Sequence, residues 1–169
     1  MNYIVLGNIS SIFAMLFLFL AVAQKDNHKL ITIQGVSYFF FALAGLILKG
    51  YSGLVQDIIG FIRNLCIATN KNNIHIRNIL LVSGIVFGYI LNNKGFLGIF
   101  PIIGTFQYSI VSSKKSVSNK HLQLSIILNA VLMIIYSFVI QNYVNMITNT
   151  ITILISIQTL RKDFASACL

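Results

Sequence analysis

Seven long apolar runs, separated by short polar connections, dominate this sequence of 169 residues. A helix of about 20 apolar residues is long enough to cross the roughly 30 Å hydrocarbon core of a bilayer. Short connections force neighbouring helices to run antiparallel, so the pattern predicts an all-α membrane protein with about seven transmembrane helices in a single domain, 1–169. The runs lie near 3–23, 30–48, 52–69, 76–92, 96–113, 122–140 and 143–160.

Composition supports lipid as the surroundings of the chain. The residues are 57% hydrophobic and only 9% charged, whereas soluble domains contain about 25% charged residues. The net charge is +9, but the Lys and Arg residues are scattered between apolar runs, as in membrane loops, so we expect no nucleic-acid partner. Two cysteines are too few for a disulfide framework. No phosphate loop, nucleophile elbow or metal-ligand spacing is present, so we expect neither an enzyme nor a cofactor.

The basic residues predict the orientation. If seven helices alternate across the membrane, ten of the twelve Lys and Arg residues lie on one side or near its edge, and only Lys49 and Lys94 lie on the other. Cytoplasmic loops carry the excess of basic residues, so we expect the N-terminus outside and the C-terminus in the cytoplasm. The ten are Lys25, Lys29, Arg63, Lys71, Arg77, Lys114, Lys115, Lys120, Arg161 and Lys162.

An internal repeat is predicted at an offset of 92 residues. Helices 1 and 5 start on the same side of the membrane, so a three-helix unit can recur in parallel with helix 4 as the inverting linker. At this offset Ser37 falls opposite Asn129, and Tyr51 opposite Tyr143. The sequence therefore predicts a 3-1-3 arrangement, with repeat one at 3–69, a linker helix at 76–92 and repeat two at 96–161.

The third helix of each repeat carries a polar stripe with the spacing i, i+4, i+7 and i+11, which is one face of a helix. Polar groups that face lipid cost several kcal/mol, so we expect both stripes to face the bundle interior. Asp57 and Asn149 fall at the same computed depth, about 9 Å below the outer boundary. The stripes are Gly53, Asp57, Gly60 and Asn64, and Asn145, Asn149, Thr152 and Ser156. The candidate substrate-binding residues are Asp57, Asn64, Asn149, Thr152 and Ser156.

Each polar feature also has a purely structural interpretation. Small and amide side chains often let membrane helices pack and hydrogen-bond. Arg63 either extends to the cytoplasmic interface or binds an anion or carbonyl groups inside the bundle. Pro101, the only proline, interrupts helix 5 and is a candidate hinge, with a static kink as the alternative. Cavity-lining and packing roles are both open for Gln107, Tyr108, Asn129 and Tyr136.

Short motifs link the chain to two known groups of proteins. Ile62 to Leu65, Pro101 to Thr105 and the exit of helix 7 at Arg161 resemble the YgjV-type family of bacterial inner-membrane proteins. That resemblance implies a location, the bacterial inner membrane, and an architecture. The 3-1-3 arrangement also resembles the SWEET and PQ-loop sugar transporters, where polar residues on each third helix contact substrate. Asp57 with Asn64, and Asn149 with Ser156, match those positions, but Pro101 is followed by Ile102 and no Pro-Gln dipeptide is present.

Two functions remain open from the sequence. In the first, the protein transports a small polar solute, and the two repeats tilt against each other around a cavity near the midplane. In the second, it is a membrane scaffold or a helper subunit that transports nothing. An open pocket between helices 3 and 7 favours the first, and a sealed bundle favours the second. Apart from the lipid bilayer, no partner, oligomeric state or coupling ion is predicted.

Overall fold

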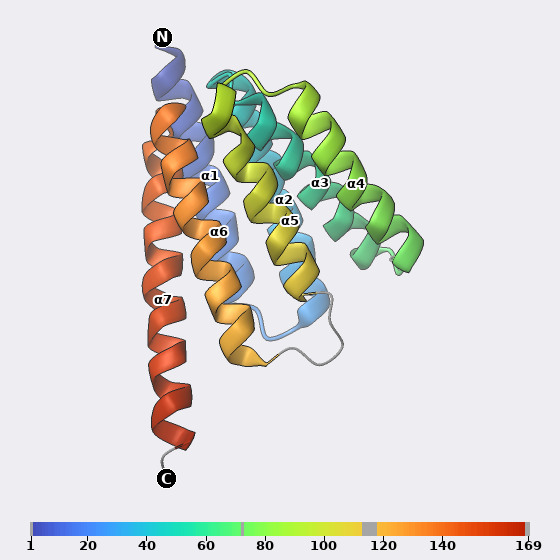
Figure 1. The fold of residues 1–169 in the computed structure, drawn as a ribbon, viewed down its shortest axis with the longest axis vertical. Helices are drawn as coiled ribbons and strands as arrows, with labels where there is room; N and C mark the ends of the chain where they lie inside the picture. Colours follow the sequence, from blue (N-terminus) through green and yellow to red (C-terminus); the bar gives the residue numbers. More distant parts are fainter. Residues whose placement is uncertain (1, 72, 113–117, 168–169) are drawn as a thin grey trace.

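The computed structural model of this chain describes residues 2–71, 73–112 and 118–167. Over these ranges it contains seven α-helices, one 3-10 helix and no strand, which confirms the predicted all-helical class (Figure 1). Most helices begin or end within a few residues of the predicted bounds, but the last continues beyond residue 160. The elements are α1 (Tyr3–Val22), α2 (Asn27–Ile47), α3 (Tyr51–Ala68), α4 (Ile74–Ile90), η1 (Gly95–Ile99), α5 (Phe100–Ser112), α6 (Asn119–Val139) and α7 (Tyr143–Ala167).

Five helix starts are fixed by the sequence locally. In each, the side chain of the residue before the helix accepts a hydrogen bond from an amide of the first turn, which has no partner within the helix. These N-cap residues are Asn2, Asp26, Asn73, Ser118 and Asn142. Helix α3 differs, because Gly50 precedes it and offers no side chain. Its first turn therefore depends on groups from elsewhere in the fold.

The helices form a closed ring. Each packs against the next one in the chain, and α1 also packs against α7, which completes the circle. Helix α5 contacts α3 as well as its neighbours α4 and α6. The two termini lie at opposite ends of the bundle, as an odd number of antiparallel helices requires (Figure 1). In the same view, α3 and α4 lean away from α7 toward the end where the C-terminus lies.

The outer surface of the ring is apolar, and the residues at the contacts between helices are small. On α1, the buried side is Gly7, Ser10, Ser11, Ala14 and Ala21, whereas large residues such as Phe13, Leu16 and Leu20 are exposed. Small residues at contacts and large apolar ones outside are typical of membrane helices. In the described ranges, three helices are long and apolar enough to cross a membrane by themselves: α1, α2 from His28, and α6. Helices α4 and η1–α5 are apolar but shorter.

The turns after α2 and α6 have the same geometry. Lys49 and Gln141 adopt the left-handed conformation, with φ of 55° and 59°. The amide of the next residue, Gly50 or Asn142, donates a hydrogen bond to the carbonyl five residues earlier, at 2.8 Å and 2.9 Å. Such bonds are typical of helix ends that terminate in a left-handed residue. The two turns stand 92 residues apart, which is the offset of the predicted repeat.

Each of these turns is also held by an asparagine from the other half of the chain. The Asn93 side-chain amide donates to the Lys49 carbonyl at 2.8 Å, and the Asn8 side-chain amide donates to the Gln141 carbonyl at 2.9 Å. The oxygen of each asparagine accepts an amide hydrogen bond from the start of the following helix. At this end of the bundle, the two halves are therefore tied to each other reciprocally.

Pro101 lies in the first turn of α5, directly after a 3-10 helix, and its role as a hinge stays a prediction. A 3-10 helix, Gly95–Ile99, replaces the expected first turn, and α5 begins at Phe100. Pro101 is thus the second residue of α5 and is fully buried. In a first turn, an amide has no partner within the helix, so a proline there removes no helical hydrogen bond. Pro101 marks the change from 3-10 to α geometry.

Candidate functional site

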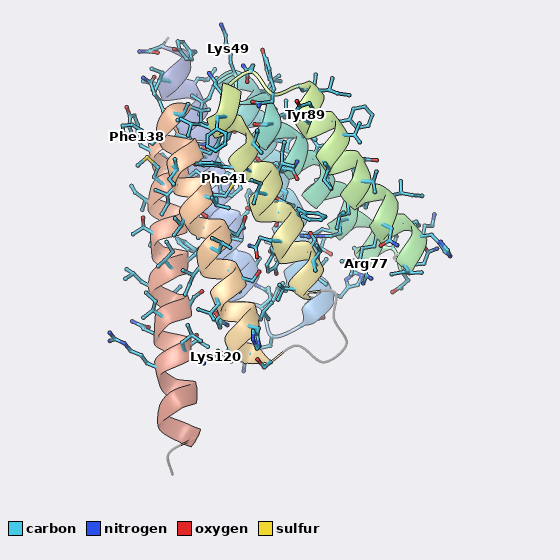
Figure 2. The ribbon with its side chains drawn as sticks, in the orientation of Figure 1. Phe41, Lys49, Arg77, Tyr89, Lys120 and Phe138 are labelled. Carbon is cyan, nitrogen blue, oxygen red and sulfur yellow. The ribbon has the colours of Figure 1, made fainter. Side chains whose placement is uncertain are left out.

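One end of the ring is filled by a packed apolar cluster. Tyr136, which is 1% exposed, packs with Leu48 and Ile140, and Phe100 lies against this group. Leu48 ends α2, Ile140 ends α6 and Phe100 starts α5, so the cluster lies at the end of the bundle where Lys49 is labelled in Figure 2. We call this part of the molecule the closed end.

The Tyr136 side chain also supplies the missing cap of α3. Its hydroxyl accepts a hydrogen bond from the Gly53 amide at 3.1 Å and from the Ser52 hydroxyl at 3.3 Å. The ring lies where side chains of α3 are absent: a Cβ added to Gly53 would come within 2.6 Å of it, and one added to Gly50 within 2.7 Å of its hydroxyl. The void left at this contact is about 10 Å³, barely enough for one water molecule.

Beyond the closed end the ring is hollow. A cavity of about 530 Å³ is lined by residues from all seven α-helices. It extends from Asp57, the seventh residue of α3, toward Arg77 in the first turn of α4 and Thr159 in the later part of α7. Val22, at the end of α1, lines the cavity and is 69% exposed, so the cavity is continuous with the outside of the ring there.

Four of the five predicted site residues line this one cavity: Asp57, Asn149, Thr152 and Ser156. Asn64 does not. It is 3% exposed and its amide donates to the Ile31 carbonyl at 3.3 Å and to the Gln34 side chain at 3.2 Å, both on α2. Helix periodicity places Asn64 on the same face of α3 as Asp57, but α2 covers that face at the depth of Asn64. It therefore acts as a packing residue between α2 and α3.

An acidic and a basic side chain of α3 line the cavity, and neither has an oppositely charged partner among the described residues. The Asp57 carboxyl group makes no hydrogen bond or ion pair with any described residue. Arg63 points into the bundle, where its guanidinium donates to the Tyr38 hydroxyl at 3.4 Å and lies 5.9 Å from the centre of that ring. Gly60 makes room for this ring, because a Cβ there would meet it at 2.9 Å. Of the two interpretations of Arg63, the structure favours the one inside the bundle.

The facing helix, α7, presents neutral polar groups. The Asn149 amide donates to the Asn145 backbone carbonyl at 2.8 Å and to its side-chain oxygen at 3.0 Å, and the Asn145 amide donates to Ser137 at 2.9 Å. The Thr152 hydroxyl donates to the Thr148 carbonyl at 3.0 Å. Because these donors are used within the protein, the groups that α7 offers to the cavity are mainly acceptor oxygens.

A family model described as bacterial inner membrane protein, Imp-YgjV, matches residues 5–166. The chain belongs to this family. No curated protein and no solved structure is detectably similar to it. The family gives the location, a bacterial inner membrane, which agrees with the apolar surface of the ring.

In this Imp-YgjV protein, the other polar residues within the helices fall into three groups. Tyr108 and Asn129 line the cavity, as do Gln34, Tyr38 and Gln123, which were not predicted. Gln56 of α3 also lines it, but its amide is bound to the Gly84 carbonyl of α4 at 2.8 Å. Gln107 instead binds Ser125 of α6, at 2.7 Å and 2.8 Å, and Tyr136 fills the closed end. The signal for the missed residues is their position within otherwise apolar helices. Among the described residues, no three His, Cys, Asp or Glu side chains gather as a metal site requires.

Proposed function

We propose that this protein carries a small polar solute across the bacterial inner membrane. The observation that supports this most directly is the cavity of about 530 Å³, a size typical of small-molecule sites. Its wall includes a carboxyl group, two guanidinium groups and many amides and hydroxyls. Polar groups inside a membrane protein are costly unless they meet one another, water or a solute, and here many of them meet the cavity.

The alternative is a scaffold or helper subunit that transports nothing. A protein of that kind gains nothing from a hollow interior, since packing is the main source of stability between membrane helices. In a sealed bundle, Asp57 would be paired with neighbouring polar groups. Its carboxyl group faces cavity space without a hydrogen-bond partner among the described residues, which favours the transporter.

The proposal includes seven membrane spans, with the N-terminus outside and the C-terminus in the cytoplasm. Arg77 and Lys120 lie toward the C-terminal end of the bundle, and Lys49 lies at the closed end (Figure 2). This distribution supports a cytoplasmic C-terminal end and an external closed end. Lys114 and Lys115 lie outside the described residues. The cavity would then be accessible from the cytoplasm.

We also propose the 3-1-3 repeat and a rocking movement of its two units, 3–69 and 96–161, linked by 76–92. The turns after α2 and α6 lie 92 residues apart, and each is bound by an asparagine from the other half of the chain, which supports the repeat. Their backbone geometry also occurs after α3, at Asn70, so it is not specific to the repeat. For an outward-facing state, the contact of Tyr136 with the first turn of α3 must open. Pro101 is the candidate hinge in the second unit, because the chain changes from 3-10 to α geometry there.

A ligand screen on the purified protein tests the transporter proposal. Solutes that bind the folded state raise its melting temperature. We expect at least one small polar solute to stabilise the wild-type protein and to cross the bilayer of proteoliposomes that contain it. Asp57→Asn keeps the shape of the side chain and removes its charge, so it should leave the fold intact while transport is lost.

The matched control is Asp26→Asn. Asp26 is exposed, lies outside the cavity and caps α2, a role that asparagine fills equally well. This variant should transport like the wild type. A protein that no solute stabilises, or that binds a solute without moving it across the bilayer, would count for the scaffold.

A further inference from the structure

The ionisable groups in the wall of the cavity indicate which class of solute fits it. Among the described residues, the carboxyl and guanidinium side chains in its wall are those of Asp57, Arg63 and Arg77. Arg77 lies in the first turn of α4, toward the end of the bundle where the C-terminus lies (Figure 2). We call this end, opposite the closed end, the basic end. Asp57 and Arg63 lie deeper, on the same helix. They are separated by six residues, or about 9 Å of helix rise, so they do not pair with each other.

Neither Asp57 nor Arg63 has a partner of opposite charge among the described residues. A charge removed from water costs several kcal/mol unless it is paired and hydrogen-bonded. Arg63 has five N–H donors, and its only hydrogen-bond acceptor in the described part of the chain is the Tyr38 hydroxyl. A planar guanidinium with free donors fits a carboxylate in a two-pronged geometry.

We infer that the cavity binds a small zwitterion, with its ammonium group on Asp57 and its carboxylate on Arg63. A solute with only a carboxylate would leave Asp57 unpaired, and one with only an amine would leave Arg63 unpaired. A neutral sugar would leave both unpaired. Helical side chains lean toward the helix start, so Arg63 extends back toward the level of Asp57 and shortens the gap that the solute must span.

The neighbouring groups suit this orientation. Gly60 leaves the space in which the Tyr38 ring lies, and that ring supports the guanidinium of Arg63 from one side. On the opposite wall, α7 presents acceptor oxygens along Asn149 and Thr152, which an ammonium group can meet as donor. The inference rests on the proposed function of the cavity and names its substrate class.

Matched small molecules test the inference on the purified full-length protein in detergent. γ-Aminobutyrate carries both charges, butyrate only the carboxylate, butylamine only the amine, and glucose neither. Glycine, β-alanine and 5-aminopentanoate change the distance between the two charges. We expect the best zwitterion of this series to raise the melting temperature at concentrations at least about tenfold lower than butyrate, butylamine or glucose require.

Two variants assign the ends of the solute. Arg63→Gln should remove the advantage of γ-aminobutyrate over butylamine, and Asp57→Asn should remove its advantage over butyrate. Arg63→Lys keeps the charge and serves where the glutamine variant folds poorly; it should retain part of the preference. Lys29→Gln, an exposed change outside the cavity, should leave the whole ranking as in the wild type.

The possible results separate the two proposals. Equal or better stabilisation by glucose, butyrate or butylamine overturns the zwitterion, and so does a series in which no zwitterion stabilises the protein. If glucose binds and also crosses the bilayer, the substrate class is wrong while transport stands. If a zwitterion binds with the expected ranking but does not cross, the class stands and transport fails.

Discussion

The two ends of the ring differ in how tightly their side chains are packed. At the closed end, Tyr136 is packed against glycines of α3, and the remaining void is about 10 Å³. At the other end, the same seven helices enclose about 530 Å³. The glycines at the closed end allow close approach of a ring, whereas at the basic end the side chains leave open space between the helices. The same bundle is thus tightly packed at one end and contains a large cavity toward the other.

The difference extends to how the helix ends are held. At the closed end, side chains from distant parts of the sequence bind the turns: Asn8 binds the turn before α7, and Asn93 and Tyr136 bind the start of α3. At the basic end, the caps of α2, α4 and α6 come from the residue just before each helix. The halves are therefore coupled across the closed end, although Asn2 and Asn142 also cap α1 and α7 locally there. At the basic end, His28 of α2 binds the Ala68 carbonyl of α3, a contact within the first half of the chain.

The largest change in stability should follow from Gly53→Ala. The added methyl group would lie 2.6 Å from the Tyr136 ring, which is fully buried and cannot turn aside. Overpacking of this kind costs about 1–3 kcal/mol. The measurement is thermal or denaturant unfolding in detergent.

Gly84→Ala is the matched control in the wall of the cavity. Its new methyl group would lie 3.4 Å from the nearest atom, the side-chain oxygen of Gln56, which is an ordinary van der Waals contact. Because no atom has to move, the change in stability should stay within about 0.5 kcal/mol. Equal effects of the two substitutions would mean that the closed end is no tighter than the cavity wall.

A smaller effect is expected for Tyr136→Phe. The ring remains, so the packing is kept, but the Gly53 amide and the Ser52 hydroxyl lose their partner. The expected cost is about 1 kcal/mol, with a shift of the protein toward states open at the closed end. Unfolding measures the first effect, and labelling of a cavity cysteine from the closed side measures the second. A variant as stable as wild type and still sealed would show that packing alone closes this end.

The all-helical architecture could be predicted from the sequence because each helix is recognised from its own run of apolar residues. Apolar length gives the helices, and the 3.6-residue period places Asp57 on the face of α3 that lines the cavity, and Asn149, Thr152 and Ser156 on that of α7. Periodicity does not say which neighbour covers a face at a given depth. For that reason, the periodicity predicts that Asn64 lines the cavity although its amide binds α2, and it does not decide between the two interpretations of Arg63.

The closed end was not predicted because it depends on contacts across the whole chain. Tyr136 lies 83 residues from Gly53, and nothing local indicates that its hydroxyl caps α3. Likewise, a proline in an apolar run suggests a kink, but a preceding 3-10 helix makes Pro101 an ordinary first-turn residue. Both features follow from how helices meet, which the order of residues in one helix does not contain.

The central claim is that water reaches the middle of the ring from the basic end and not from the closed end. Thiol labelling in membranes of known sidedness tests it, with Thr152→Cys in a chain whose Cys66 and Cys168 are replaced by serine. Thr152 lines the cavity, and Leu154, two residues further along α7, is 57% exposed on the outside of the ring. A membrane-impermeant maleimide should label Thr152→Cys from the cytoplasmic side only and should leave Leu154→Cys unlabelled from either side. Absence of labelling at Thr152→Cys, or labelling only from the external side, would contradict the account.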